Sequence, residues 1–431
     1  MRFADLFSGI GGSRIGFEQA CRDIGITPEC VFSVEIKKHA LRVYNANFRE
    51  TDIAEAVITD INDVEAEQFP DVDVLLGGFP CQPFSSGGKR EGFDDARGRG
   101  QLFYEIMRIA KAKKPRLMIL ENVENIERHD GGNTLRVILT AMEEQGYSVS
   151  YKVINAFDCG VPQRRKRVFI VACRDREISL NDIVPLQIQA KIRDIIDHTD
   201  TLSDLPVTFR EALMKIPIQS LAGKSIKDRR GGDTNIHSWD LELYGAVSVE
   251  EKRVLNVLLL ERRKKHWAKS KNIDWMDGMP LTTTELYTVL KDEFSIEELE
   301  QILDSLVERK YLRKEHPKKL VNKKRVLETS LPKGYNINKG RLSFPLSQIL
   351  GMDDVCPTLT ATDASKIGVI ANGEVIRRLN ARELARVCGF PDSFIVDVPD
   401  VSMSDLYDLF GNMICPPVMR IVARTALKQI L

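Results

Sequence analysis

The feature that most constrains the fold of this chain is an alternation of strand-like and helix-like segments that continues to about residue 175. Short apolar runs bounded by glycine, proline or polar residues are typical of buried strands, and longer amphipathic stretches are typical of helices. The predicted strands are residues 2–7, 29–36, 72–76, 115–123, 147–156 and 168–172, and the predicted helices are residues 13–20, 37–47, 102–113 and 134–145. This order predicts an α/β fold built on a doubly wound, mostly parallel, Rossmann-like sheet.

A region of different character follows, from about residue 175 to residue 354. Residues 247–269 are predicted to form one long charged helix, and residues 281–312 a helix-turn-helix in which two segments have capping-box spacing. From Arg309 to Arg341 the chain has twelve Lys or Arg against two Glu, and a basic β-wing would begin there. A winged-helix-like DNA-binding unit and a plain helical spacer both fit this pattern.

Composition and termini exclude several classes of protein. The net charge is zero, and no apolar run approaches the length of a membrane span. The N-terminus lacks the features of a signal peptide, so we expect a cytoplasmic protein. The eight cysteines are scattered without a C-x-x-C pair or a nearby His, which argues against a disulfide framework or a structural metal site.

The first turn of the predicted sheet is a candidate ligand site. Ser8-Gly9-Ile10-Gly11-Gly12 joins a strand to a helix, and such a turn lets the backbone approach a ligand at a helix N-terminus. The full dinucleotide fingerprint is missing, so we expect a nucleotide-like ligand without a pyrophosphate. Glu35 either accepts hydrogen bonds from a ribose or caps the next helix, and Asp52 either meets an adenine edge or is the N-cap of residues 54–57.

Polar residues at the ends of later strands form a second candidate site. Cys81 stands in the stiff sequence Pro80-Cys81-Gln82-Pro83 beyond a buried strand, where it is either a packed thiol or a nucleophile. Glu121 is either a desolvated carboxylate with a raised pKa or a solvated one. The run Gln163-Arg164-Arg165-Lys166-Arg167 is either a solvated face or directed into the site. Asn412 is either a ligand contact or a turn residue.

Together these segments resemble, in the same order along the chain, the motifs of the DNA cytosine-C5 methyltransferases of bacterial restriction-modification systems. The resemblance covers nearly all of residues 1–178 and 357–431. The segments that carry it are Asp5–Gly12, Gly78–Ser85, Glu121–Val123, Gln163–Arg167, Arg378–Pro391 and Gly411–Asn412. One such motif is weak, but six in register identify the chain as a member of the family. Two departures are a doubled Arg-Gly pair at residues 97–100 and Met413-Ile414-Cys415 in the closing motif.

The resemblance implies a reaction and roles for four residues. Cys81 would add as a thiolate to C6 of cytosine, so that C5 takes a methyl group from S-adenosylmethionine. Glu121 would act at N3 and Arg165 would contact O2, while Arg167 would contact a phosphate or organise the site. The cytosine would have to leave the duplex for this chemistry, with the loop of residues 85–101 closing over it.

The resemblance also implies binding residues and domains. Those expected to contact S-adenosylmethionine are Phe7, Gly9, Gly11, Gly12, Glu35, Asp52, Ile53, Pro80, Leu102 and Asn412. Those expected to contact DNA are Ser85, Gln163, Arg309, Lys310, Lys323, Lys324 and Arg325. The expected domains are a catalytic domain at 1–178, a smaller target-recognition domain at 179–405 with the winged-helix-like insert at about 281–330, and a return to the catalytic domain at 406–431.

The expected partner is duplex DNA, bound by a monomer, with a cognate restriction endonuclease as genetic partner and with no membrane or metal. A methyltransferase of the same chemistry acting on tRNA is the nearest alternative, and a catalytically inactive DNA-binding module is an alternative from another class. The large, partly basic insert favours DNA, and Cys81, Glu121 and the arginine motif favour an enzyme. An amino-methylating enzyme is disfavoured, because Pro80-Cys81-Gln82 stands where its acidic-Pro-Pro-aromatic motif belongs.

Overall fold

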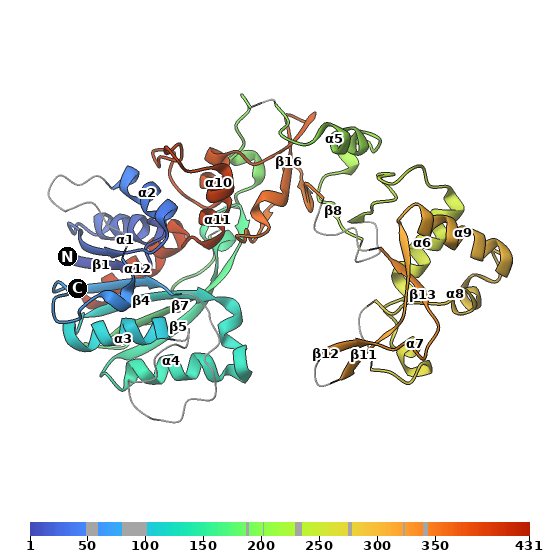
Figure 1. Cartoon of the computed structure of the whole chain (residues 1–431). Coiled ribbons are helices and arrows are strands. Elements are labelled where there is room, and N and C mark those ends of the chain that lie inside the picture. The colour runs from blue at the N-terminus through green and yellow to red at the C-terminus, as the bar shows by residue number, and fades with distance from the viewer. Residues whose placement is uncertain are drawn as a thin grey trace. The chain divides into compact units, whose positions relative to one another are not determined.

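The structure is a computed structural model that describes residues 1–48, 59–79, 101–186, 189–200, 202–228, 235–274, 278–321, 324–338 and 344–431. These residues form two compact units (Figure 1). The first unit comprises Met1–Asp197, Asp353–Ser365 and Leu379–Leu431, and the second comprises His198–Met352 and Lys366–Arg378. None of the described helices has both the length and the apolar character needed to cross a membrane.

A six-stranded sheet is the centre of the first unit, in the order β2-β1-β3-β4-β7-β5. Its strands are β1 (Arg2–Leu6), β2 (Glu29–Val34), β3 (Val74–Gly78), β4 (Leu117–Val123), β5 (Ser148–Asn155) and β7 (Lys166–Cys173). β1, β2, β3 and β4 pair in parallel, whereas β7 runs antiparallel to β4 and β5. Residues 156–165 alone connect β5 to β7, which is too few for the helical crossover of a parallel pair. The predicted α/β fold is confirmed.

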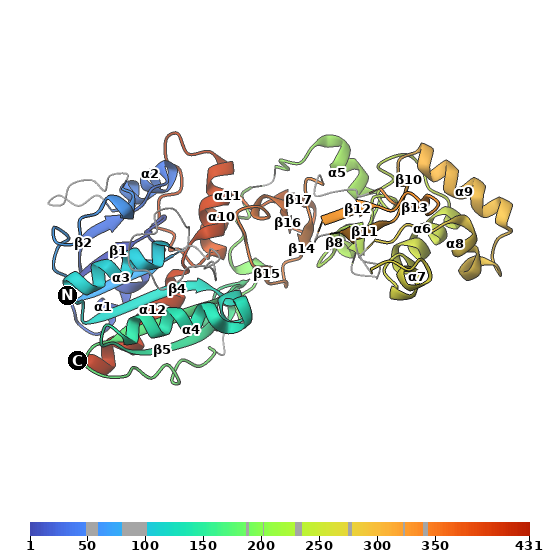
Figure 2. The same cartoon turned by 60° about the horizontal axis from the view of Figure 1, so that its bottom comes forward.

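Helices cover both faces of this sheet (Figure 2). They are α1 (Gly12–Asp23), α2 (Lys38–Asn47), α3 (Gln101–Lys113), α4 (Asn133–Glu143) and α12 (Pro416–Ile430). Side chains alternate along each strand, so residues such as Ile170 point to the face that shares a buried core with α3 and α4. On the opposite face Phe3 contacts Phe17 of α1, with ring centroids 4.8 Å apart. The α12 helix packs on α1 at Gly16, where a side chain would collide with the backbone of α12.

The two units differ from the domain boundaries expected at residues 178 and 405. Residues 379–405 belong to the first unit, because α10 (Ala381–Val387) is bonded to other segments of that unit. Gln163 Nε2 donates to the Val387 carbonyl at 3.1 Å, and Glu383 Oε1 accepts from the Asp197 backbone N–H at 2.8 Å. The chain therefore returns to the sheet unit well before residue 406.

The second unit contains a mixed sheet in the order β17-β16-β14-β8-β9. Its strands are β8 (Ser225–Ile226), β9 (Asn235–Ile236), β14 (Gln348–Leu350), β16 (Ile367–Ala371) and β17 (Val375–Arg378). Helix α5 (Val207–Met214) contributes Phe209 and Leu213 to a buried core that also contains Ile349 and Ile376 of the sheet. Strands from two distant parts of the chain are thus joined in one sheet.

The second unit also contains a winged-helix-like arrangement, which we call the winged unit (residues 247–338). Its elements are α6 (Val249–Glu261), α7 (Lys265–Ser270), α8 (Thr283–Leu290), α9 (Ile296–Glu308), β10 (Leu312–Glu315), β11 (Lys318–Val321), β12 (Lys324–Leu327) and β13 (Gly334–Ile337). Thr282 with Glu285 and Ser295 with Glu298 form capping boxes, so the predicted helix-turn-helix is confirmed. Helices α6, α8 and α9 share a buried core with β10 and β13, which a plain helical spacer would lack. Strands β11 and β12 form an antiparallel hairpin, the wing.

The prediction of one helix over residues 247–269 is wrong, because the chain breaks between α6 and α7. Lys264 has an extended backbone, with φ −75° and ψ 129°. The Arg262 carbonyl accepts from the Met279 backbone N–H at 2.8 Å instead of continuing the helix. The break lets Trp267 enter the buried core, where its indole N–H donates to Glu261 Oε2 at 3.2 Å.

Candidate active site

The carboxyl ends of three neighbouring parallel strands define the candidate active site. Leu6 of β1 is paired with Gly77 of β3, and Gly78 is paired with Glu121 of β4. The end of β3, which leads along the chain to Cys81, therefore lies directly beside the Glu121 carboxylate. The predicted residues Pro80, Cys81 and Ser85 lie outside the described part of the chain, as do Asp52, Ile53 and Lys323.

Glu121 is buried, with 8% of its surface exposed. A side chain at Gly78 would come within 3.5 Å of its Oε2, so glycine leaves the carboxylate uncovered on that side. Burial raises the pKa of the Glu121 carboxyl, although the charges of Arg167 and Arg165 act in the opposite direction. The alternative of a solvated carboxylate at a strand end is excluded.

Arg167 is the nearest cation to this carboxylate among the described residues. Its Nε lies 3.0 Å from Glu121 Oε1, so the two side chains form an ion pair. Burial lowers the pKa of the Arg167 guanidinium to about 10, and the neighbouring charge of Arg165 acts in the same direction. Arg167 is thus directed into the site and is not part of a solvated face.

Arg165 is almost fully enclosed, with 3% of its surface exposed. Its Nη1 donates to the carbonyls of Leu359 (2.9 Å) and Gly411 (3.1 Å), and its Nη2 donates to that of Met413 (2.8 Å). Its Nε–H is buried and has no hydrogen-bond partner among the described residues. The Arg165 guanidinium therefore connects two segments from the C-terminal part of the chain, and its Nε–H remains available to donate a hydrogen bond.

Gln163 is fully buried, and its amide is used inside the protein. Its Nε2 donates to the Val387 carbonyl, and its Oε1 accepts from the Leu359 backbone N–H at 3.4 Å. The side chain does not reach the surface, so this structure gives no support to a DNA contact by Gln163.

The glycine turn after β1 has a backbone that few residue types accept. Gly9 and Gly11 have φ values of 55° and 87°, in the left-handed region that favours glycine. Phe7 also has a positive φ, 57°, which is a strained conformation for an aromatic residue. A Cβ at Gly12 would lie 2.0 Å from the Ile414 carbonyl oxygen, so only glycine permits this approach of the C-terminal segment.

Glu35 holds this turn in place. Its Oε2 accepts from the Gly9 backbone N–H at 2.8 Å, and its Oε1 accepts from the Lys37 backbone N–H at 2.7 Å. The second bond is the helix-capping alternative, because Lys37 is the N-cap of α2. The carboxylate also connects the second strand end to the glycine turn.

The other two described residues expected at the cofactor lie in different environments. Leu102 is the second residue of α3 and packs against the core of the sheet unit. Asn412 is exposed at the end of α11 (Met403–Asn412), where its Nδ2 donates to the backbone carbonyl and Oδ1 of Asp408, both at 3.0 Å. Asn412 is thus a helix-end residue whose amide already has an internal partner.

Three polar residues of the motifs are buried in a way that we did not predict. Asp5 is fully buried, its carboxylate accepts from Ser13 Oγ at 2.7 Å, and burial raises its pKa to about 7. Ser8 Oγ is buried without a hydrogen-bond partner among the described residues. Asn122 Nδ2 donates to the Phe79 carbonyl at 3.0 Å and so fixes the end of β3. Their positions inside the motifs were the only sequence signal for them.

The described basic residues expected to contact DNA lie in the winged unit and differ in availability. Arg309 is ion-paired with Glu251 and donates to the Ala246 carbonyl, so it joins α9 to α6. Lys310, Lys324 and Arg325 are exposed. Lys310 is bonded internally through its backbone: its N–H donates to the Val307 carbonyl at 3.0 Å, and its carbonyl accepts from Asn338 Nδ2 at 2.8 Å.

Solved structures of two other proteins have the same fold. The Schizosaccharomyces pombe Dnmt2 methyltransferase matches with a TM-score of 0.55 at 16% identity, over 100% of this chain and 99% of that one. The Entamoeba histolytica methyltransferase EhMeth matches with a TM-score of 0.51 at 13% identity, with the same coverage. The chain has the fold of a methyltransferase.

The sequence comparisons are more specific. The family model for C-5 cytosine-specific DNA methylase matches residues 1–428. The Type II methyltransferase M.NlaIV of Neisseria lactamica is 45% identical over 438 residues, which cover 100% of this chain and 99% of that protein. M.HgiCI of Herpetosiphon aurantiacus is 38% identical over 453 residues, with 100% and 98% coverage. The chain therefore belongs to the C-5 cytosine-specific DNA methylases and is a DNA (cytosine-5-)-methyltransferase, as the motifs predicted.

Proposed function

We propose that this methyltransferase transfers the methyl group of S-adenosylmethionine to C5 of a flipped-out cytosine in a specific duplex DNA sequence, after Cys81 has added to C6. The observation that carries the proposal is the buried Glu121 carboxylate, held by Arg167, together with the buried Arg165 Nε–H, which has no hydrogen-bond partner among the described residues. Both belong to the site beside the end of β3, from which Cys81 is three residues away in the chain. A cytosine offers complementary partners, since N3 accepts a proton and O2 accepts a hydrogen bond.

The other cysteines support Cys81 as the nucleophile. All seven in the described part of the chain are buried and free. Burial raises the pKa of six of these thiols, for example to about 12 for Cys159 and Cys388, so that they stay protonated near neutral pH. Only a thiolate is an effective nucleophile. Cys81 is the one cysteine outside the described residues, and in the sequence it follows β3 by three residues.

The proposed reaction begins with nucleophilic addition. The Cys81 thiolate forms a bond to C6, and the electron pair of the C5–C6 double bond moves into the ring as N3 takes a proton from Glu121. The pair would then return through C5 to the methyl carbon as N3 gives its proton back to Glu121, while the bond between that carbon and the donor's sulfur breaks and leaves its electron pair on sulfur. Transfer of the C5 proton to water and cleavage of the bond between C6 and the cysteine sulfur would restore the double bond and the thiolate.

Each charged residue has a distinct part in this reaction. The raised pKa of Glu121 favours the protonated form that donates at N3. Arg165 Nε–H would donate to O2, where negative charge develops during addition. Arg167 holds the carboxylate in place and stabilises it once its proton has left.

Residues around the glycine turn fit the binding of S-adenosylmethionine, which supplies an electrophilic methyl group on a sulfonium. Among the described residues, the buried Ser8 Oγ has no hydrogen-bond partner, and no atom lies within 4 Å of a side-chain position at Gly9. Glu35 would hold the ribose with the lone pairs that its two backbone bonds leave free. The set proposed to complete the pocket is Phe7, Gly11, Gly12, Asp52, Ile53, Pro80, Leu102 and Asn412.

The second unit would recognise the DNA sequence, and the basic stretch Arg309–Arg341 would contact phosphates. Removing the target base from the stack is needed because stacking hides both faces of its ring. The names of the Type II relatives favour a cognate restriction endonuclease as genetic partner.

Trapping with 5-fluorocytosine tests the chemistry. Fluorine at C5 cannot leave as a proton does, so the covalent adduct persists after methyl transfer. We expect a stable complex of protein, DNA and methyl group whose linkage maps to Cys81 by mass spectrometry, and none for Cys81→Ser, which should still bind S-adenosylmethionine. Methyl transfer without an adduct, or an adduct on another cysteine, would refute the mechanism.

The substrate is tested separately with methyl transfer to duplex DNA and to tRNA in parallel assays. We expect transfer to DNA, at cytosines located by bisulfite sequencing. Transfer to tRNA alone would overturn the proposed substrate while leaving the chemistry intact.

A further inference from the structure

Charge is divided sharply within the winged unit. From Thr282 to Glu308, which spans the helix-turn-helix, the chain has eight Asp or Glu and one Lys. From Arg309 to Glu328, which spans β10 and the wing, it has nine Lys or Arg and two Glu. The helices and the strands that follow them therefore present opposite charges to a polyanion.

The acidic half includes the helix that would be expected to enter DNA. In a helix-turn-helix the second helix lies in the major groove, between two rows of phosphates. Here that helix is α9 (Ile296–Glu308), which contains five Asp or Glu and no Lys or Arg. Glu297, Glu300 and Glu308 are exposed. A Glu can accept from the amino group of cytosine, but a helix without one cation has nothing to offset phosphate repulsion.

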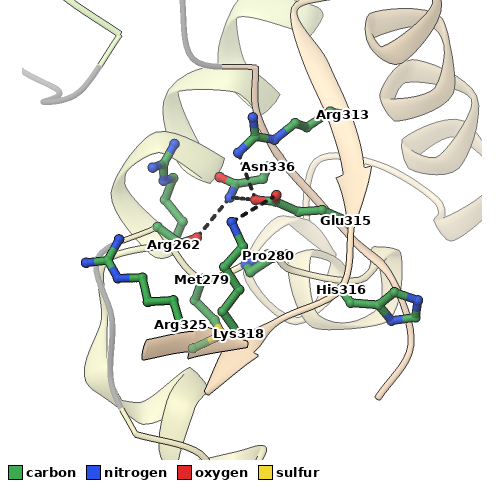
Figure 3. A pocket seen from close by; sticks show the side chains of 10 residues that line it. Arg262, Met279, Pro280, Arg313, Glu315, His316, Lys318, Arg325 and Asn336 are labelled. Carbon is green, nitrogen blue, oxygen red and sulfur yellow. Dashed lines mark hydrogen bonds and ion pairs between the residues drawn. The ribbon is translucent and has the colours of Figure 1, made fainter. Parts of the chain in front are cut away.

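The basic half contains exposed cations and a pocket at the base of the wing. Among the described residues, Lys324 and Arg325 of β12 are exposed and have no ion-pair partner. A pocket that is open to solvent is lined by Arg313, Lys318 and Arg325 together with Arg262. Figure 3 shows Arg313 and Lys318 directed toward Glu315, whereas the Arg325 guanidinium extends away from it.

Glu315 does not neutralise this pocket. Its carboxylate accepts from Arg313 Nη2 at 3.0 Å and from Asn336 Nδ2 at 2.6 Å, and it lies 3.8 Å from Lys318 Nζ. Glu315 is the one acid among the described residues that line the pocket, against four Lys or Arg. Arg313 Nε–H is buried and has no partner among the described residues. An anion is the ligand that this donor set fits.

We propose that the winged unit contacts DNA through its wing, with a backbone phosphate at the cationic pocket, and not through α9. This inference rests on the proposed DNA-recognition role of the second unit. It assigns the phosphate contacts to Lys318, Lys324 and Arg325, and it leaves Arg309 as the tie between α9 and α6.

Two variants of matched surface exposure test the assignment. In the first, Lys324→Gln and Arg325→Gln remove two charges from the wing; in the second, Glu297→Gln, Glu300→Gln and Glu308→Gln remove three from α9. Binding of each to a fluorescent duplex with the methylated sequence is measured by anisotropy from 50 to 300 mM salt. S-adenosylmethionine binding and the melting temperature should match the wild type in both.

The plot of log K against log salt has a negative slope. For the wing variant we expect this slope to be less steep by about 0.9 per lost contact, hence by about 1.8 for two contacts. If the plots of the variant and the wild type meet at 1 M salt, this corresponds to about 60-fold weaker binding at 0.1 M salt. The α9 variant should bind as well as the wild type or more tightly. Unchanged binding by the wing variant at every salt concentration, or weakened binding by the α9 variant, would overturn the inference. Methyl transfer to DNA by the wild-type protein is measured alongside. If it is observed while the wing inference fails, the proposed function still stands.

Discussion

Replacing Glu121 with Gln tests the central step of the proposed mechanism. The two side chains have the same shape, so the packing of a residue with 8% of its surface exposed is preserved. The amide oxygen still faces Arg167, whose Nε lies 3.0 Å from Oε1 in the native protein. What the substitution removes is the proton that Glu121 would deliver to N3 of the cytosine.

The size of the effect follows from the type of catalysis lost. A positioned general acid contributes about 10²- to 10⁴-fold to a rate, or about 3 to 5 kcal/mol of transition-state stabilisation. For Glu121→Gln we expect a loss of rate near the lower end of this range, because its amide N–H still donates a hydrogen bond to N3. For Glu121→Ala we expect a loss near the upper end, because this substitution leaves N3 without a donor and Arg167 without its carboxylate partner.

Single-turnover methyl transfer measured from pH 5 to pH 9 gives the decisive comparison. The wild-type rate should rise with pH as the Cys81 thiolate forms and fall at higher pH as Glu121 loses its proton. Because burial raises the pKa of Glu121, the protonated form persists to a higher pH than for a solvated carboxyl. In Glu121→Gln the fall at high pH should disappear, since the amide does not titrate.

Controls separate this effect from a loss of binding or folding. Glu121→Gln should bind S-adenosylmethionine and DNA with affinities close to those of the wild type, and its melting temperature should change little. The proton-donor role would be refuted if Glu121→Gln transferred methyl groups within tenfold of the wild-type rate, or if its rate still fell at high pH.

Two further predictions concern the turn after β1. Gly12→Ala would place a Cβ 2.0 Å from the Ile414 carbonyl oxygen, so we expect a loss of about 1–3 kcal/mol in the free energy of unfolding and weaker S-adenosylmethionine binding; an unchanged urea midpoint would contradict the close approach. Asp5 has a pKa raised by burial from 3.8 to about 7, so between these values the folded state keeps a proton that the unfolded state has lost, and its contribution to stability falls as pH rises. Between pH 5 and pH 7.5 the free energy of unfolding of the wild type, measured in urea, should therefore fall by up to about 3 kcal/mol more than that of Asp5→Asn. The same pH dependence in the two proteins would rule out the raised pKa of Asp5.

The succession of strands and helices along the chain could be predicted because it depends on local patterns. Apolar runs that end in polar residues mark buried strands, and parallel strands bring their carboxyl ends to one edge. The antiparallel direction of β7 was not predicted, although the connection between β5 and β7 is too short for a parallel crossover. The break after α6 could not be predicted, because it depends on a tertiary bond between Arg262 and Met279 and on the burial of Trp267.

The roles of side chains within the motifs were harder to predict than the motifs themselves. Gln163 and Arg165 stand in one basic, polar run, yet both are buried, because segments near residues 359, 387 and 411 close over them. Sequence periodicity carries no information about such distant partners. Burial decides the functional interpretation here: it takes Gln163 away from DNA, and it leaves the Arg165 Nε–H without a hydrogen-bond partner among the described residues.

Arg165 also explains how the site can form although a long insertion, the second unit, separates its segments in the sequence. The second unit interrupts the sheet unit with 155 residues between residues 198 and 352. Closing a flexible loop of that length costs about 4.5 kcal/mol from the logarithmic dependence on chain length, and a folded insertion costs less. Three hydrogen bonds from one guanidinium to the carbonyls of Leu359, Gly411 and Met413, at about 1.5–3 kcal/mol each, are enough to offset it. The residue proposed to contact the cytosine is thus also the one that holds the returning chain against the sheet, so that the site is complete only when the segments on both sides of the insertion have docked.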